Sequence, residues 1–365
     1  MNIEYRELRF LIFFIPVFFL KLINITASDK LLVIVSISCF IFFTICILGN
    51  EKMGKAKIIS MVFLVIFTSI LVLTCGKQGA FFSTIMIVAL SGIKSYKKIY
   101  KVLMAVGSIA LLVSMYIERN GQEGARYING QWVSIYKRSN ILYISFFAVV
   151  CLYLFQQDKL KYKQLFTISV IGIIMYKYTG SRTGLLMLIG LVFLLIILRK
   201  PKIFHNRIIN KLCIFSPLIS FCISLFVTIL YGNNSAVNIL NMMMQGRIYQ
   251  NKLFLNSYGI KLLGQHIFES MDANNYQVLD CAYMDMLICY GLLFTIIWIL
   301  GSIVVIKYLY VNERYIEVAI MVVYSIYGIS ETFLPNCYLN VSLFLYAECL
   351  FYMIEHRKIK IKCIR

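Results

Sequence analysis

Long apolar runs recur along the whole 365-residue chain, and they constrain its fold more than any other feature. A helix needs about 20 mostly apolar residues to cross a bilayer. Hydrophobic residues make up 61% of the chain and charged residues 14%, against roughly 45–50% and about 25% in a soluble domain. The core of a water-soluble domain has no room for so large a share of hydrophobic residues. The sequence therefore predicts an integral membrane protein and excludes a soluble enzyme, a disordered chain and a disulfide-rich secreted scaffold.

Twelve runs approach the length of a transmembrane helix, although the fourth, seventh and eighth are short. The first run has no small-residue cleavage site and further spans follow it, so we expect an anchor. The expected fold is all-α, a single polytopic membrane domain over residues 1–365 with about twelve transmembrane helices. The expected spans are Leu8–Ile25, Leu31–Gly49, Ile58–Cys75, Ala80–Ile93, Val102–Ile117, Ile141–Phe155, Leu165–Tyr178, Gly184–Leu198, Leu212–Tyr231, Cys281–Ile306, Tyr315–Phe333 and Cys337–Ile354.

The basic residues follow the pattern that sets the orientation of a membrane protein. Lys and Arg number 36 against 16 Asp and Glu, and 24 of the 36 fall in alternate connections or at the two chain ends. Because basic residues collect on the cytoplasmic side, both termini are expected in the cytoplasm. The net charge of +20 is then largely topological, and it predicts the lipid bilayer, not nucleic acid, as the partner.

Two connections on the outer side are long in this topology. They are Glu118–Ser139 and Gly232–Asp280, the second of which joins the ninth and tenth spans. Connections longer than about 15 residues usually carry function or are disordered. Residues 232–280 contain many apolar side chains, including Met242–Met244. We therefore expect this extracytoplasmic loop to form short amphipathic helices on the outer membrane surface.

A first candidate site is the turn Thr179-Gly180-Ser181-Arg182-Thr183-Gly184, at the outer junction of two short spans. A guanidinium near lipid costs about 2.5–3.5 kcal/mol by insertion scales, so its presence calls for a reason. An arginine binds phosphate oxygens through two parallel hydrogen bonds. Arg182 and Ser181 are therefore candidates for binding phosphate. The alternative is an interfacial turn whose arginine extends back into water.

A second cation lies in the long outer loop, within Gln245-Gly246-Arg247-Ile248-Tyr249. Two arginines that face one site would suit a diphosphate, which carries more than one negative charge. The alternative for Arg247 is an ordinary solvated loop arginine.

Carboxylates and tyrosines close the long loop, with Asp280, Tyr283 and Asp285 close together. A carboxylate beside a positioned hydroxyl acts as a general base, and aromatic rings next to acids are typical of sugar sites. The alternative is a polar loop end with acids in water. His266 is the only histidine on the outer side and a further candidate base. Glu331 and Glu348 lie within or at the ends of the last two spans, where ionisable groups are functional candidates.

No cofactor motif is present. The chain has no P-loop, no GxGxxG and no H-E-x-x-H, and its eleven cysteines form no CxxC pair. These motifs mark nucleotide, dinucleotide and metal sites. The sequence predicts neither a cofactor nor a metal, and it disfavours an ATP-driven transporter.

The chain resembles bacterial Wzy-type polysaccharide polymerases, in the wider family that includes the O-antigen ligases. The hydropathy resemblance covers most of the chain, with about a dozen spans and one long outer loop in the C-terminal half. The family often shows Asp-Asn or His-Asn where the loop re-enters the membrane, whereas Asp280 here precedes a cysteine. The local matches are the Ser-Arg-x-Gly turn at Ser181–Gly184, the loop arginine at Gly246-Arg247, the glycine turn at Leu263-Gly264, and the re-entry stretch at Leu279–Tyr283 with Tyr290–Leu293.

The resemblance implies transfer of a glycan from undecaprenyl diphosphate to an incoming lipid-linked repeat unit, at the outer face of the bacterial cytoplasmic membrane. Arg182 and Arg247 would bind the departing diphosphate, Asp280 would be the base, and Ser181, Tyr283, Asp285 and His266 would contact substrate. A chain-length regulator and a flippase are the protein partners it implies. The alternatives are an O-antigen-type ligase that uses the same donor, and a lipid-linked oligosaccharide flippase or other transporter.

Overall fold

The computed structural model describes residues 5–22, 38, 55–90, 93, 96–120, 125–128, 131–134, 137–272 and 275–356. Helices dominate this part of the chain, which confirms the helical fold class; the strands form two short hairpins. Apart from residue 38, the expected span Leu31–Gly49 lies outside the described residues, as do both termini. The contacts divide the chain into two compact units: unit 1 is Met1–Asn50 with Ala89–Ile196, and unit 2 is Glu51–Val88 with Ile197–Arg365.

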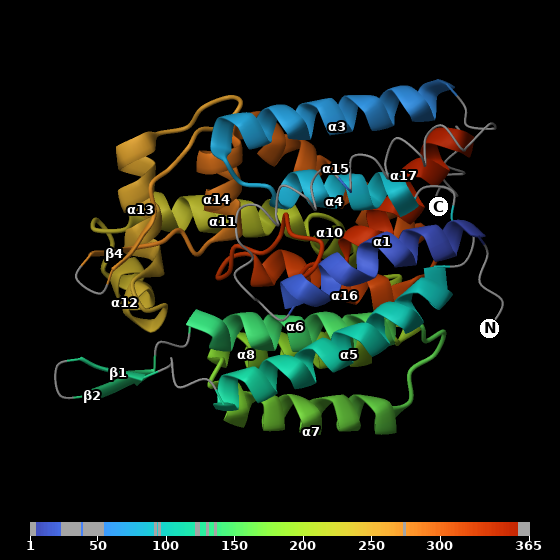
Figure 1. The fold of residues 1–365 in the computed structure, drawn as a ribbon, viewed down its shortest axis with the longest axis horizontal. Coiled ribbons are helices and arrows are strands. Elements are labelled where there is room, and N and C mark those ends of the chain that lie inside the picture. The colour runs from blue at the N-terminus through green and yellow to red at the C-terminus, as the bar shows by residue number, and fades with distance from the viewer. Residues whose placement is uncertain are drawn as a thin grey trace. The chain divides into compact units, whose positions relative to one another are not determined.

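Unit 1 is a set of packed helices in which α1 lies against α5, α5 against α6, and α6 against α7 (Figure 1). Its hairpin pairs β1 with β2 and falls in the segment expected on the outer side. The elements are α1 (Tyr5–Leu22), α5 (Tyr96–Asn120), β1 (Ala125–Ile128), β2 (Gln131–Ser134), α6 (Lys137–Leu154), α7 (Tyr162–Thr179) and α8 (Arg182–Leu198).

A buried tyrosine joins three helices of unit 1. Tyr143 of α6 is fully buried, and its hydroxyl donates to the carbonyl of Gly172 on α7 at 3.1 Å. Its ring lies against Gly184 of α8, where a Cβ would stand 2.2 Å from Tyr143 Cδ1. The absence of a side chain at Gly184 therefore lets α8 approach α6 closely.

Unit 2 contains the remaining helices and the second hairpin, β3 with β4. Its first two helices precede residues Ala89–Ile196 of unit 1 in the sequence, and its other helices follow them. The elements are α3 (Lys55–Cys75), α4 (Gly79–Leu90), α9 (Pro201–Phe204), α10 (Arg207–Ile214), α11 (Ser216–Leu230), α12 (Ser235–Met243), α13 (Arg247–Tyr258), β3 (Ser270–Asp272), β4 (Asn275–Gln277), α14 (Ala282–Asp285), the π-helical segment η1 (Met286–Tyr290), α15 (Leu292–Val311), α16 (Tyr315–Tyr327) and α17 (Leu343–His356).

Three described helices are long and apolar enough to cross a membrane: Lys57–Cys75, Tyr96–Tyr116 and Leu292–Val311. A fourth crossing is counted if α10 and α11, which meet at a bend of 63°, form one broken span. The expectation of about twelve spans is therefore too high for the described residues. Several expected spans are helices too short to cross: α4 has 12 residues, or about 18 Å at 1.5 Å per residue, against a hydrocarbon core of about 30 Å.

The last two expected spans are shortened by an irregular segment between α16 and α17, residues 328–342. Most of its side chains are buried, and it hydrogen-bonds both to α4 and within itself: Ser83 Oγ of α4 donates to the carbonyl of Pro335 at 2.6 Å, and Asn340 Nδ2 donates to that of Leu334 at 2.8 Å. Non-helical backbone at membrane depth is tolerated where protein covers it.

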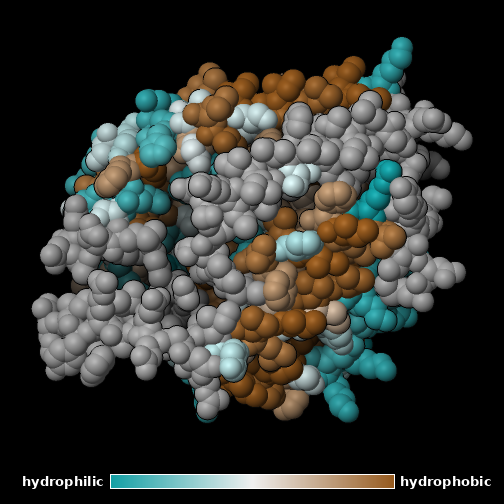
Figure 2. Space-filling view, in the orientation of Figure 1, coloured by the Kyte–Doolittle hydropathy of each residue, from teal (hydrophilic) through white to brown (hydrophobic). Residues whose placement is uncertain are grey.

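The expected span Cys281–Ile306 is likewise divided, into α14, η1 and the start of α15. Its first ten residues, 281–290, are all buried, and Gly291 (φ 92°) separates η1 from α15. Only α15 has the length of a span. Large apolar side chains cover the exterior of α3 and of the helices of unit 1, as Figure 2 shows in brown; Leu73 is 86% exposed and Phe166 70%. Apolar surface of this kind is compatible with contact with lipid.

Candidate functional site

The long loop contains two short helices, as expected, and their junction fixes Arg247. Gly246 begins α13 with a left-handed backbone (φ 83°). Asn241 of α12 accepts a hydrogen bond through Oδ1 from the backbone N–H of Tyr249 at 2.9 Å, which links α12 to the first turn of α13. Arg247 is therefore held at the first position of α13.

Arg247 lies between two carboxylates from distant parts of unit 2. Its Nη1 donates to Glu331 Oε1 at 3.1 Å and to the backbone carbonyl of Ser330. Its Nε stands 3.6 Å from Asp280 Oδ2. The side chains are 14% exposed for Arg247, 11% for Glu331 and 27% for Asp280. We call Arg247, Asp280, Glu331 and Ser330 the Arg247 cluster.

A second cation pairs with carboxylates next to this cluster. Lys77, in the turn between α3 and α4, lies 2.6 Å from Asp285 Oδ1 and 3.5 Å from Glu269 Oε1. Glu269 also accepts from the backbone N–H of Leu279 at 3.3 Å, one residue before Asp280. Burial alone would lower the pKa of Lys77, but the nearby acidic groups, with Asp285 first among them and Glu269 contributing, together raise that pKa above its usual value.

A close crossing of two backbones holds these segments in place. A Cβ on Gly264 (φ 81°) would lie 2.1 Å from the carbonyl oxygen of Cys289, and one on Gly291 would lie 2.2 Å from the nitrogen of Gly264. Only glycine fits at either position. The backbone N–H of Gln265 donates to the same Cys289 carbonyl at 2.8 Å. A carbonyl in the π-helical segment η1 is thus used by the loop, in keeping with the frequent occurrence of π-helical turns at functional sites.

The two ion-pair groups bring two cations, Lys77 and Arg247, together with four carboxylates, Glu269, Asp280, Asp285 and Glu331. A partly exposed carboxylate held next to a guanidinium can take a proton from a hydroxyl while the guanidinium binds an anion. Of the four carboxylates, the side chain of Asp280 is the most exposed. This places the candidate base of the sequence analysis within reach of Arg247.

Of the other expected site residues in unit 2, two are buried and one is exposed. Tyr283 is fully buried, and its hydroxyl donates to the carbonyl of Ser325 at 2.8 Å, so its ring presents no surface to a sugar. Asp285 is buried and ion-paired with Lys77. His266 is exposed, and its ring lies against Gly76 at the end of α3.

Ser181 and Arg182 belong to unit 1, whereas the Arg247 cluster belongs to unit 2. Ser181 is 2% exposed, and its Oγ accepts from the backbone N–H of Gly184 at 3.4 Å, which caps the start of α8. Arg182, in the first turn of α8, is exposed. The serine and the second glycine of this turn thus have clear roles in packing the helices.

Lys77 is the main functional candidate that sequence reasoning missed. It follows a predicted span directly, where a lysine is usually assigned to membrane topology. The signal that could have identified it is its place in a connection expected on the outer side, where basic residues are expected to be the minority. In the described part of the chain, no group of three or more His, Cys, Asp or Glu residues is arranged to hold a metal ion.

No protein-family model, no curated protein and no solved structure matches the chain. Any assignment of function therefore depends on the geometry of the site and on the sequence motifs.

Proposed function

We propose that the protein is a membrane glycosyltransferase that polymerises undecaprenyl-diphosphate-linked oligosaccharide repeat units into a surface polysaccharide. The observation that carries the proposal is the Arg247 cluster: an anion-binding guanidinium 3.6 Å from the carboxylate of Asp280, the most exposed of its acids. The reaction needs these two groups side by side, since it forms an anion and releases a hydroxyl proton that a base must take. The resemblance to Wzy-type polymerases supports the same assignment.

In the proposed reaction, a hydroxyl of the acceptor sugar attacks the anomeric carbon of the donor glycan. A new glycosidic C–O bond forms, and the bond from the anomeric carbon to the diphosphate oxygen breaks with its electron pair. Asp280 takes the hydroxyl proton, and Arg247 stabilises the negative charge on the leaving diphosphate. In-line attack inverts the anomeric configuration. The energy is already present in the donor, so no nucleotide is required.

The carboxylates set a condition on how the donor binds. Arg247 already contacts Asp280 and Glu331, so the diphosphate must replace one of them. Glu331 makes the shorter contact, at 3.1 Å. In the proposed mechanism the diphosphate displaces Glu331 and leaves Asp280 available to the acceptor. Arg182 is our second candidate for a diphosphate contact.

The topology expected from the basic residues puts the cluster at the outer face of a bacterial cytoplasmic membrane, with both termini in the cytoplasm. Arg247, Asp280 and Lys77 all lie in connections assigned to that side. A donor anchored by its lipid in the outer leaflet would reach them from the membrane. A flippase that supplies the repeat units and a chain-length regulator are the partners that this role requires.

The test is polymerisation by the purified full-length protein. The protein is incubated with a synthetic undecaprenyl-diphosphate repeat unit, and the products are separated by length. We expect a ladder of products that grows with time, with release of one undecaprenyl diphosphate per bond. Transfer to a different acceptor lipid without a ladder would identify a ligase instead. Movement of intact substrate across the bilayer without new bonds would identify a flippase.

The variant that ties the reaction to the site is Asp280→Asn, which keeps the side-chain shape and removes the base. We expect the rate of ladder formation to fall by about 10²-fold or more, as for loss of a general base. Asp158→Asn is the matched control, because Asp158 is an exposed aspartate of unit 1. A ladder of normal rate from Asp280→Asn would overturn the role of Asp280.

A further inference from the structure

Unit 1 contains an open pocket between α5, α6 and α7, separate from the cluster described above. Its volume is about 890 Å³, and its walls are mainly apolar. Leu112 and Met115 contribute from α5, and Ile168, Ile171 and Met175 from α7. A pocket of this size, with apolar walls and one polar end, is typical of sites for amphipathic ligands.

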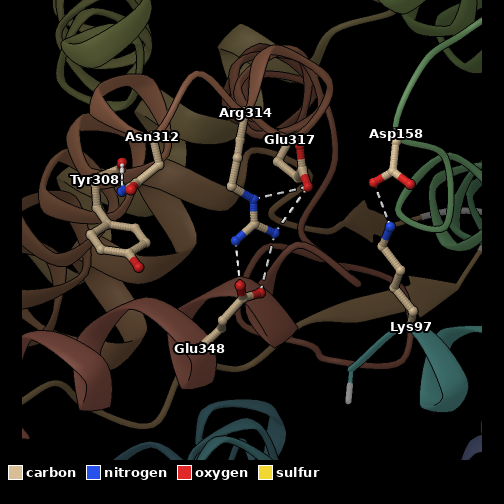
Figure 3. A network of polar contacts seen from close by, with 7 residues as sticks. All are labelled: Lys97, Asp158, Tyr308, Asn312, Arg314, Glu317 and Glu348. Atoms are coloured by element: carbon tan, nitrogen blue, oxygen red, sulfur yellow. Dashed lines mark hydrogen bonds and ion pairs between the residues drawn. The ribbon is translucent and has the colours of Figure 1, made fainter. Parts of the chain in front are cut away.

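One end of the pocket is strongly basic. Lys159, Lys161 and Lys163 line it there, at the connection from α6 to α7, and all three are exposed. The carboxylate closest to them in sequence, Asp158, is paired with Lys97 (Figure 3). The N-terminus of α7, which carries a partial positive charge, lies at the same end. This basic end of the pocket therefore attracts an anion.

Neutral polar groups separate the lysines from the apolar walls. Gln164 Nε2 donates to the hydroxyl of Tyr153 at 2.7 Å and to Gln157 Oε1 at 3.2 Å, and all three residues line the pocket. The order along the pocket is thus cationic, polar and then apolar. This is the order of a phospholipid from its phosphate through its esters to its acyl chains.

The length of the pocket also fits one leaflet. From Lys163 to Met175 the helix rises about 18 Å at 1.5 Å per residue, and half of a bilayer core is about 15 Å. The lysines fall in a connection that the positive-inside rule assigns to the cytoplasm. Figure 2 shows hydrophilic side chains gathered at the end of unit 1 where the α6–α7 connection lies, beside an apolar surface.

We propose that this pocket binds one anionic phospholipid of the cytoplasmic leaflet, with its phosphate at Lys159, Lys161 and Lys163 and an acyl chain between α5 and α7. Basic pockets between membrane helices on the cytoplasmic side recognise anionic headgroups in this way. A general attraction of surface lysines to the membrane would not require a pocket, and it is the alternative that the experiment must separate.

The experiment is native mass spectrometry of the full-length protein, released from detergent after addition of phosphatidylglycerol or of phosphatidylcholine with the same chains. We expect one phosphatidylglycerol to be retained preferentially. The triple variant Lys159→Gln, Lys161→Gln, Lys163→Gln should lower that retention by about tenfold or more, with no change for phosphatidylcholine. The matched control is Lys200→Gln, Lys202→Gln, Lys211→Gln, which removes three exposed lysines of unit 2. An equal loss in the control would overturn the proposal.

A second measurement locates the acyl chain. Ile171→Trp places a fluorophore in the wall of the pocket, and lipids brominated on their acyl chains quench it on contact. Brominated phosphatidylglycerol should quench at a lower mole fraction than brominated phosphatidylcholine, and adding the three Lys→Gln changes should abolish the difference. Equal quenching by the two lipids in the unaltered lysine background would contradict the proposal.

Discussion

Two arginines of unit 2 each contact two carboxylates, yet the two groups differ in geometry. Arg314 precedes α16 and uses all three guanidinium nitrogens: Nε and Nη2 contact Glu317 Oε1 at 3.0 and 2.9 Å, and Nη1 and Nη2 hold the two oxygens of Glu348 (Figure 3). Burial alone would lower the pKa of Arg314, but the two carboxylates raise it above its usual value. This group ties the start of α16 to α17.

Arg247 is held less tightly, because one of its two acid contacts is long. Its contact with Asp280, at 3.6 Å, is longer than a hydrogen bond, and Asp280 comes from the segment that closes the long loop. A fork with both carboxylate oxygens, as at Glu348, is suited to stability, whereas a contact with one oxygen, as at Glu331, is more easily exchanged for a ligand. The comparison teaches that the same residue types serve packing at Arg314 and, in our proposal, chemistry at Arg247.

The largest expected effect is the loss of activity in Arg247→Ala. Removing a group that stabilises a developing negative charge costs about 10²–10³-fold in rate, so ladder formation should nearly stop. The unfolding midpoint in detergent should fall less than in Arg314→Ala. Lys261→Ala is the control, because Lys261 is an exposed cation of the same loop. Normal activity in Arg247→Ala would place the chemistry elsewhere.

The reverse pattern is expected for Arg314→Ala. This change leaves Glu317 and Glu348 without their common cation, and breaking a buried pair in this way costs about 3–5 kcal/mol. Because Arg314 is 25% exposed, we expect the lower end, about 3 kcal/mol, measured by denaturant unfolding in detergent. The folded fraction should keep its specific activity. Lys307→Ala, an exposed charge on α15, should change neither quantity; an inactive but stably folded Arg314→Ala protein would remove the contrast between the two arginines.

A smaller effect, about tenfold on the rate of ladder formation, is expected for Arg182→Ala. One charge-assisted hydrogen bond to a phosphate contributes about 1.5–3 kcal/mol, and exposure of Arg182 to solvent favours the lower end. Lys177→Ala is the matched control, since Lys177 is an exposed cation in the last turn of α7. If the rate of ladder formation falls equally in both variants, Arg182 acts only through its positive charge at the membrane surface and not through a contact with the diphosphate.

The smallest effect distinguishes the two acids of the Arg247 cluster. Glu331→Gln removes the carboxylate that the diphosphate must displace, so the KM for the donor should fall severalfold while kcat changes little. Glu313→Gln, an exposed glutamate, is the control. A KM that rises in Glu331→Gln would show that Glu331 assists donor binding and would reverse its proposed role.

The sequence supports some of these elements better than others. Apolar composition predicted the spans at α3, α5 and α15, because long uninterrupted helices leave a clear signal. It overestimated the number of spans because several apolar runs form helices too short to cross, and the last two runs are shortened by the irregular segment 328–342, which contacts such as Ser83 with Pro335 stabilise. Those contacts join residues about 250 positions apart and leave no local pattern.

The candidate site, like the fold, could be predicted from the sequence only in part. Arg247 and Asp280 could be singled out because charged residues are rare in this chain, and the structure brings them together. Tyr283 was expected to face a sugar, but its place in α14 turns it toward Ser325 in the core. Lys77 was missed because its partners Glu269 and Asp285 lie some 200 residues away. Which neighbour a side chain faces depends on tertiary packing, which composition and spacing do not encode.

The central claim is that Arg247 and Asp280 act together in glycosyl transfer, and a double-mutant cycle in single-turnover kinetics tests it most directly. The rate of undecaprenyl diphosphate release is measured for the wild type, Arg247→Ala, Asp280→Asn and the double variant. Residues that act as a unit are strongly non-additive, so we expect the double variant to be about as slow as the slower single variant. Losses that multiply would show that the two residues act independently, and unchanged release in both single variants would contradict the account.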